Sequence, residues 1–125
     1  SVALAGTQND WQSPLVDRTI DRLEGRGDEL KLLLAHRPMT ATRAQRDNST
    51  VDLVMAGHTH GGQVALPLVG PIITLSAAPN HVGAGGLHTL GGRKIYVSRG
   101  VGMERRDAPR MRLGARPEVA LLLIE

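Results

Sequence analysis

The stretch VDLVMAGHTHGGQVALP, residues 51–67, decides the fold prediction. Its first six residues form an apolar run with a single acid, which predicts a buried strand over 51–56. His58 and His60 follow directly and are surrounded by three glycines. Side chains at i and i+2 of an extended chain point to the same side, about 6.6 Å apart. The pattern therefore predicts two imidazoles facing one cleft, where they bind one metal or two adjacent metals, or else two ordinary loop histidines at the surface.

The residues before this stretch predict a βαβ unit. Short apolar runs at 2–5 and 30–35 are typical of strands. Between them, Ser13 followed by a proline is a helix start, and apolar residues recur at helical spacing until Gly25. A second, short helix is predicted over 39–46. Two parallel strands separated by a helix indicate an α/β fold.

His36 follows the strand predicted at 30–35, as His58 and His60 follow the next one. The carboxyl ends of parallel strands meet at one edge of a sheet, which is where open α/β sheets bind their ligands. The sequence therefore predicts that all three histidines emerge at the same edge.

Downstream of the histidines the pattern changes to short β segments interrupted by glycine and proline. Gly91 and Gly92 predict a tight hairpin turn between two alternating segments. Loops are predicted over 81–86 and 104–117. The strands expected in this half are 63–66, 72–75, 87–90, 94–98 and 118–124.

Composition indicates one soluble globular domain. The 125 residues are 41% apolar but only 2% aromatic, so the core must consist mainly of aliphatic side chains. No apolar run approaches the ~20 residues that span a bilayer, and the first residues do not resemble a signal peptide. Because the chain has no cysteine, a metal would need histidine, carboxylate or amide ligands.

The formal charge of +3 is concentrated in the second half. Between residues 93 and 116, eight basic residues stand against two acids, which indicates an anionic partner or a solvated surface. One Trp, one Tyr and no Phe leave little for nucleic-acid bases to stack on. A nucleic-acid binder is therefore the least favoured function.

Several motifs together resemble the calcineurin-like metallophosphoesterases, and most of all their bacterial, membrane-associated phosphodiesterase-like branch. The matching segments are LLLAHRP, DLVMAGHTHGGQ, PLVGP, GGRKIYVSRGVG and RPEVALLLIE, in the order usual for that branch. The resemblance implies the αββα fold, a β-sandwich flanked by helices, and hydrolysis of a phosphoester substrate by two divalent cations (Mn, Fe or Zn). It implies that His36 and His58 bind one cation and that His60 binds the other.

The same family has earlier signatures, Asp-x-His, Gly-Asp-x-x-Asp and Gly-Asn-His-Asp/Glu, which do not occur here. The chain is therefore expected to be the C-terminal part of one domain, residues 1–125, with the N-terminal half absent. On this interpretation it contains no catalytic residue of its own and is inactive alone. It then needs the missing half or another copy as partner. A parent protein would be cytoplasmic, or attached to a membrane through an absent N-terminal segment.

Three further residues are candidate substrate contacts. Arg37 follows His36 and is predicted either to bind a phosphate group or to face solvent. Arg99, at a strand end, is predicted to contact phosphate or to anchor a loop, and His81 to touch substrate or to lie exposed. The main alternative to an enzyme is a non-catalytic module that binds a metal or a protein.

Overall fold

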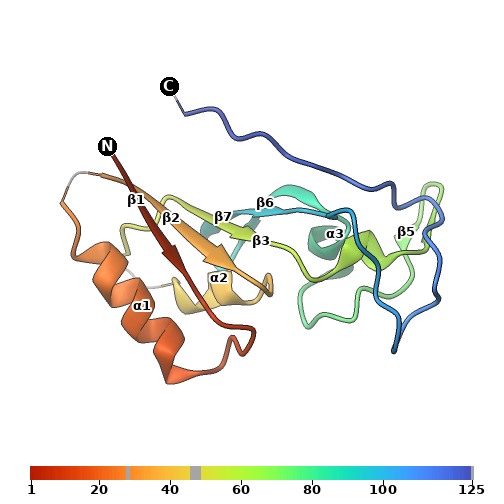
Figure 1. Cartoon of the computed structure of the whole chain (residues 1–125), viewed down its shortest axis with the longest axis horizontal. Helices are drawn as coiled ribbons and strands as arrows, with labels where there is room; N and C mark the ends of the chain where they lie inside the picture. The colour runs from red at the N-terminus through yellow and green to blue at the C-terminus, as the bar shows by residue number, and fades with distance from the viewer. Residues whose placement is uncertain (28, 46–48, 125) are drawn as a thin grey trace.

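The computed structural model describes residues 1–27, 29–45 and 49–124. Its centre is a five-stranded mixed sheet with the strand order β1-β2-β3-β7-β6 (Figure 1). All neighbouring strands are parallel except β6, which is antiparallel to β7. The strands are β1 (Val2–Gly6), β2 (Leu30–Ala35), β3 (Leu53–Ala56), β6 (Gly86–Leu90) and β7 (Arg93–Val97). The predicted α/β class and the βαβ order are confirmed.

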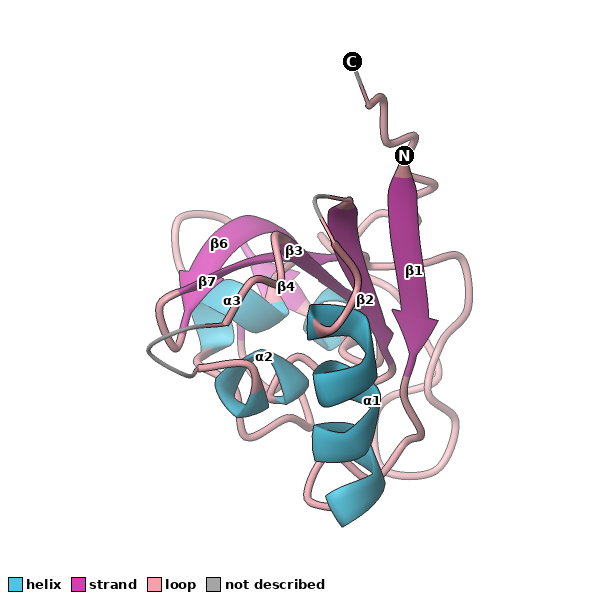
Figure 2. Cartoon of the chain, turned by 90° about the vertical axis from the view of Figure 1, so that its left-hand side faces the viewer, coloured by secondary structure: helices cyan, strands magenta, loops and turns pink. Residues whose placement is uncertain are grey.

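Helices α1 (Pro14–Glu24) and α2 (Thr40–Arg43) cover one face of this sheet (Figure 2). Helix α1 begins where the sequence predicts, because the Ser13 hydroxyl accepts a hydrogen bond from the Leu15 N–H at 3.3 Å. The helix predicted over 39–46 is shorter and ends at Arg43, while residues 46–48 lie outside the described residues. The prediction of a loop over 81–86 is wrong at its start, where α3 (Asn80–Gly83) forms one helical turn after a proline.

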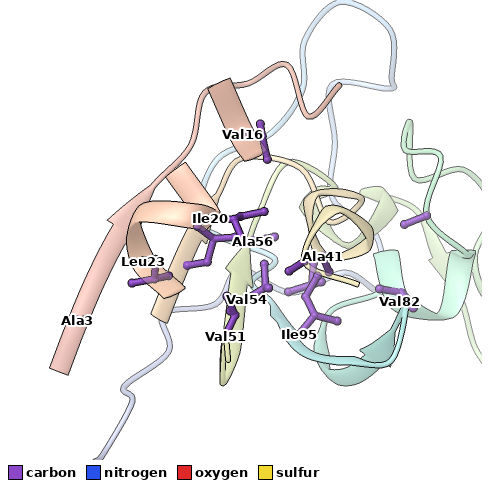
Figure 3. Packing of buried hydrophobic residues seen from close by; sticks show 14 residues of the cluster. Ala3, Val16, Ile20, Leu23, Ala41, Val51, Val54, Ala56, Val82 and Ile95 are labelled. Atoms are coloured by element: carbon purple, nitrogen blue, oxygen red, sulfur yellow. The ribbon is translucent and has the colours of Figure 1, made fainter. Parts of the chain in front are cut away.

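The core lies between the helices and the sheet. Val16, Ile20 and Leu23 recur on one side of α1, and all three are buried (Figure 3). They pack in one cluster with the strand residues that point toward the helices, including Leu33, Val54 and Ile95. This packing follows from the two periodicities of the sequence, 3.6 residues in the helix and 2 in the strands.

The opposite face of the sheet is also apolar but is incompletely covered. The strand register aligns Leu34 with Met55 and Met55 with Tyr96 across three strands. At the two ends of this face Leu4 and Leu87 are 61% and 63% exposed. The segment 118–124 runs above this face as an extended chain (Figure 1). Residues of the segment and side chains of the sheet together line two hollows.

The strand predicted over 118–124 is wrong, because this segment lies across the face of the sheet instead of along an edge. Its described backbone is anchored at the first residue, where the Glu118 N–H donates to the Gly100 carbonyl at 3.0 Å. A row of alternating apolar residues becomes a strand only when a neighbouring edge accepts its hydrogen bonds.

Two other β predictions change in the structure. The strand predicted over 63–66 is reduced to β4 (Ala65–Leu66), which pairs antiparallel with β5 (Gly70–Pro71). The strand predicted over 72–75 is wrong, since this segment bends away and Leu75 has a φ of +50°. The hairpin at Gly91 and Gly92 is confirmed, with φ of +59° and +72° as a tight turn between β6 and β7 requires. No helix of the described residues is long and apolar enough to span a membrane.

Candidate functional site

The histidine motif does not continue the extended backbone of β3. His58 and His60 have φ of +71° and +50°, and residues His60–Gly62 form a single 3-10 turn. The sequence analysis assumed an extended backbone at His58 and His60. This assumption is wrong, because β3 ends at Ala56 and the chain then turns. Positive φ in residues other than glycine costs of order 1–3 kcal/mol and is typical of functional loops.

His36 and His58 are brought into direct contact. They follow the paired residues Ala35 and Ala56, so the parallel register of β2 and β3 places them at the same edge. The Nε2 atom of His36 lies 3.1 Å from the Nδ1 atom of His58, and their ring centroids are 4.9 Å apart. The predicted convergence of His36 and His58 is thus present in the structure.

The Leu75 carbonyl determines which ring nitrogen of His58 is free to bind a ligand. Its Nε2 atom lies 3.1 Å from the Leu75 carbonyl oxygen, which can only accept a hydrogen bond. In the neutral ring Nε2 therefore carries the proton, and the lone pair is on Nδ1, the atom that faces His36. Histidines that bind metals commonly donate their second ring N–H to a backbone carbonyl, and this hydrogen bond orients the ring.

The spacing of this pair fits one cation. Two nitrogens that each lie about 2.0–2.1 Å from one metal are about 2.9–3.4 Å apart at octahedral or tetrahedral angles. The 3.1 Å between His36 Nε2 and His58 Nδ1 lies in this range. Within the described ranges, however, no group of three or more His, Cys, Asp or Glu side chains is arranged to hold a metal. The pair therefore offers part of a donor set.

His60 contacts other residues than His36 and His58 do, although it lines one hollow with His58. Its ring is close to Gly102, and its carbonyl accepts a hydrogen bond from Arg112 Nη2 at 3.1 Å. Glu104 lines the same small hollow as His58 and His60. The sequence analysis did not single out Glu104, and no local signal marks it, because only the fold of the 99–116 loop brings it to the histidines.

The three histidines have environments that favour the neutral ring. Burial lowers the pKa of His36, and the nearby His58 and Arg37 lower it further. Burial also lowers the pKa of His58, against the opposing effect of its Leu75 hydrogen bond. For His60, burial and then Arg112 lower the pKa, although Glu104 acts in the other direction. Neutral imidazole is the form that binds metals.

Gln63 and Thr59 support the motif through hydrogen bonds. Both side chains are buried, and the Thr59 hydroxyl accepts a hydrogen bond from the Gly61 N–H at 3.4 Å. The Gln63 amide bonds to the backbone at Glu104 and Pro109. These contacts join the histidine turn to the basic loop that follows β7.

The space around Gly62 is too small for a side chain. A Cβ atom at Gly62 would lie 2.5 Å from Pro71 Cβ and 2.7 Å from the Ile73 carbonyl oxygen, at a φ of +74°. Gly92 has a similar φ of +72° but open space around it. We expect Gly62→Ala to cost about 3 kcal/mol of unfolding free energy and Gly92→Ala about 1 kcal/mol, measured by urea denaturation. Equal costs would contradict the crowding.

The three predicted substrate contacts lie around the site without joining the His36–His58 pair. Arg37 donates from Nε to the Asn9 side chain at 3.0 Å. His81 is exposed on α3, and its ring packs edge-on against His88 with centroids 5.8 Å apart. Arg99 donates from Nε to Glu118 at 2.7 Å and so anchors the C-terminal segment. His81 and Arg99 line one hollow of about 780 Å³ beside Gly61.

Glu118 is the residue of the C-terminal segment that Arg99 contacts. Its carboxylate accepts hydrogen bonds from the Tyr96 hydroxyl and from Arg99. Burial alone would raise the pKa of Glu118, but the hydrogen bonds from Tyr96 and Arg99 outweigh it and hold the pKa below its ordinary value. Arg99 therefore has the structural role that the sequence analysis offered as one of two alternatives.

In an α/β sheet, the carboxyl ends of neighbouring strands are where ligands commonly bind, and His36 and His58 follow two such ends. The chain belongs to the metallophosphoesterases and corresponds to a C-terminal portion of that family. It is 36% identical over 90% of its length to the uncharacterized metallophosphoesterase YkuE of Bacillus subtilis. It is 41% identical over 74% of its length to the phosphodiesterase YaeI of Escherichia coli.

A third relative is a bovine transmembrane protein with a metallophosphoesterase domain, 33% identical over 78% of the chain. The chain spans only 36%, 31% and 20% of the lengths of these three relatives, in the same order. No protein-family model matches the sequence, and no solved structure matches it. The recognition of the family from its motifs is confirmed.

Proposed function

We propose that this chain forms the imidazole-bearing part of a metal-dependent phosphoester hydrolase, a phosphodiesterase or phosphatase with a dinuclear site. The observation that carries the proposal is the His36–His58 pair, whose facing nitrogens are 3.1 Å apart. The Leu75 carbonyl orients the second ring so that its lone pair points at the first. Membership of the metallophosphoesterases supports the same reaction class.

In this proposal His36 and His58 hold one divalent cation (Mn, Fe or Zn), and His60 holds a second. Cations bound there would polarise a phosphoryl oxygen and lower the pKa of a coordinated water. The chain's own residues keep the imidazoles neutral and oriented. Arg37, beside His36, and His81 and Arg99, in the adjoining hollow, are the proposed contacts to substrate.

Residues 1–125 are proposed to be the C-terminal part of a single domain. Three neutral imidazoles do not balance two dications, and Glu104 adds one carboxylate near His58 and His60, so we propose that further carboxylate ligands come from residues beyond these 125. The chain alone is therefore proposed to be inactive. The relatives are about three times as long as the matched part, which leaves room for such ligands in this proposal.

A chimera tests the proposal. The segment of E. coli YaeI that matches this chain is replaced by the chain's own segment, and the isolated 125-residue chain is assayed beside it. We expect the chimera to hydrolyse bis(4-nitrophenyl) phosphate, to lose activity in EDTA and to regain it with Mn²⁺ or Zn²⁺. The isolated chain should show no turnover, and metal-dependent turnover by the chain alone would contradict its proposed inactivity.

The alternative is a module that binds a metal or a protein without hydrolysis. Its protein-binding form is the one consistent with the lack of a three-donor group in the described part of the chain. A chimera that folds and contains metal, but does not turn over substrate, would favour this alternative.

A further inference from the structure

The hairpin formed by β4 and β5 presents an unusually apolar tip. Residues 64–75, VALPLVGPIITL, include no charged side chain, and their one polar residue, Thr74, is buried. Leu68 at the turn is fully exposed, and Val69, Ile73 and Ile72 are 74%, 60% and 54% exposed. Scattered exposed apolar residues are normal on soluble proteins, but a contiguous group on a projecting turn marks an interaction surface.

The loop that follows β7 lies against this hairpin and is strongly basic. The two are joined by backbone hydrogen bonds of 2.8 Å from Ala65 N to Leu113 O and from Leu113 N to Gln63 O. The hairpin and the loop lie together at one end of the molecule (Figure 1). The loop's exposed arginines are Arg105, Arg106, Arg110 and Arg116.

Acidic residues do little to offset this charge. The loop contains only Glu104 and Asp107 as acids. The Glu104 carboxylate accepts hydrogen bonds from the N–H groups of Arg105 and Arg106, at 2.7 and 2.8 Å, and these two acids are too few to balance the loop's arginines. Exposed Met111 and Leu113 add apolar surface within the same loop. An apolar tip therefore stands beside an excess of positive charge.

We propose that this surface, formed by Leu68 and Val69 at the tip, by Ile72 and Ile73 directly after β5 and by the flanking arginines, docks onto an anionic lipid bilayer. Apolar side chains on a projecting turn can enter the acyl boundary while guanidinium groups contact lipid phosphates. A second copy of the chain fits this surface less well, because pairing the same surface would bring like charges together.

Docking would bring the histidine site close to the membrane surface. The hairpin forms one wall of the hollow of about 780 Å³ that also contains Gly61, the residue next to His60. The proposal rests on exposed apolar area and charge, and it does not depend on the proposed hydrolysis. Loss of membrane binding would leave the phosphoesterase proposal intact, and an inactive chimera would leave this one intact.

Co-sedimentation of the 125-residue chain with lipid vesicles tests the proposal. Vesicles of phosphatidylcholine with one quarter phosphatidylglycerol are compared with pure phosphatidylcholine. We expect binding to the anionic vesicles only, and at least tenfold weaker binding for Leu68→Ser/Val69→Ser and for Arg105→Ser/Arg106→Ser. The matched control is Leu121→Ser/Leu123→Ser, which removes side chains that are 85% and 74% exposed on the C-terminal segment. It should change binding less than twofold.

Equal losses in the hairpin and control pairs, or equal binding to both vesicle types, would overturn the proposal. A second readout locates the contact. Trp11 is the chain's one tryptophan, so Trp11→Phe/Leu68→Trp carries a single reporter at the tip. Its fluorescence should be quenched by brominated lipids, and an unquenched signal in bound protein would contradict docking through the hairpin. Dimers that depend on Leu68, without vesicle binding, would show a protein interface instead.

Discussion

Replacement of His58 by alanine is expected to lower hydrolysis by the chimera at least a hundredfold and to remove bound metal. His58 is the one histidine that contacts His36, at 3.1 Å, while its other nitrogen is held by the Leu75 carbonyl. Alanine removes the imidazole that contacts His36, and loss of a ligand typically reduces affinity more than the 10–100-fold seen for outer contacts. Turnover of bis(4-nitrophenyl) phosphate and metal content measured by mass spectrometry report the two effects.

His88→Ala is the matched control for this prediction. His88 bonds to the Gly85 carbonyl at 2.9 Å and lies in β6, away from the strand ends that carry His36 and His58. It should retain metal and most activity. Thermal unfolding by circular dichroism should be close to that of the unchanged protein for both variants. If His58→Ala remained active and metal-loaded, the proposed ligand role would be wrong.

The second large effect is expected on association. The incompletely covered face of the sheet presents Leu4, Leu34, Met55, Tyr96 and Leu87. Apolar surfaces of this kind commonly form interfaces, and we propose that this one binds further residues of the domain or another copy of the chain. We therefore expect the isolated chain to sediment as dimers or larger species at micromolar concentration.

Leu4→Gln/Leu34→Gln should weaken this association at least tenfold. Burial of each leucine contributes about 2 kcal/mol, and the loss of 1.4 kcal/mol already corresponds to a factor of ten. Leu15→Gln is the matched control, because Leu15 is exposed on α1, on the helix-covered side. Analytical ultracentrifugation over a range of concentrations measures the effect. A monodisperse monomer, or an equal response to Leu15→Gln, would contradict the prediction.

The elements that the sequence predicted correctly have local signals. Ser13 caps α1, and the apolar spacing over 16–23 defines its buried side. Gly91 and Gly92 specify the turn between β6 and β7 through backbone angles that other residues disfavour. In each case the residues that carry the signal lie within a few positions of the structure they determine.

The predictions that failed depended on partners far along the chain. Residues 72–75 and 118–124 alternate or are continuously apolar, as strands are, but neither has a sheet edge that accepts its hydrogen bonds in the structure. The form of the turn at His58, with positive φ at His58 and His60, also has distant determinants. It depends on the loops that pack around it, through Gln63 and the backbone at Pro109.

The sequence by itself determined the class of the fold, the family and the identity of the three histidines. Only the tertiary structure decided that His36 and His58 are in direct contact, and that Glu104 comes close to the motif. The reason is physical. The local sequence specifies the residue types of the motif. The contact of the His36 and His58 rings depends instead on the register of β2 against β3, and the orientation of the His58 ring depends on the Leu75 carbonyl.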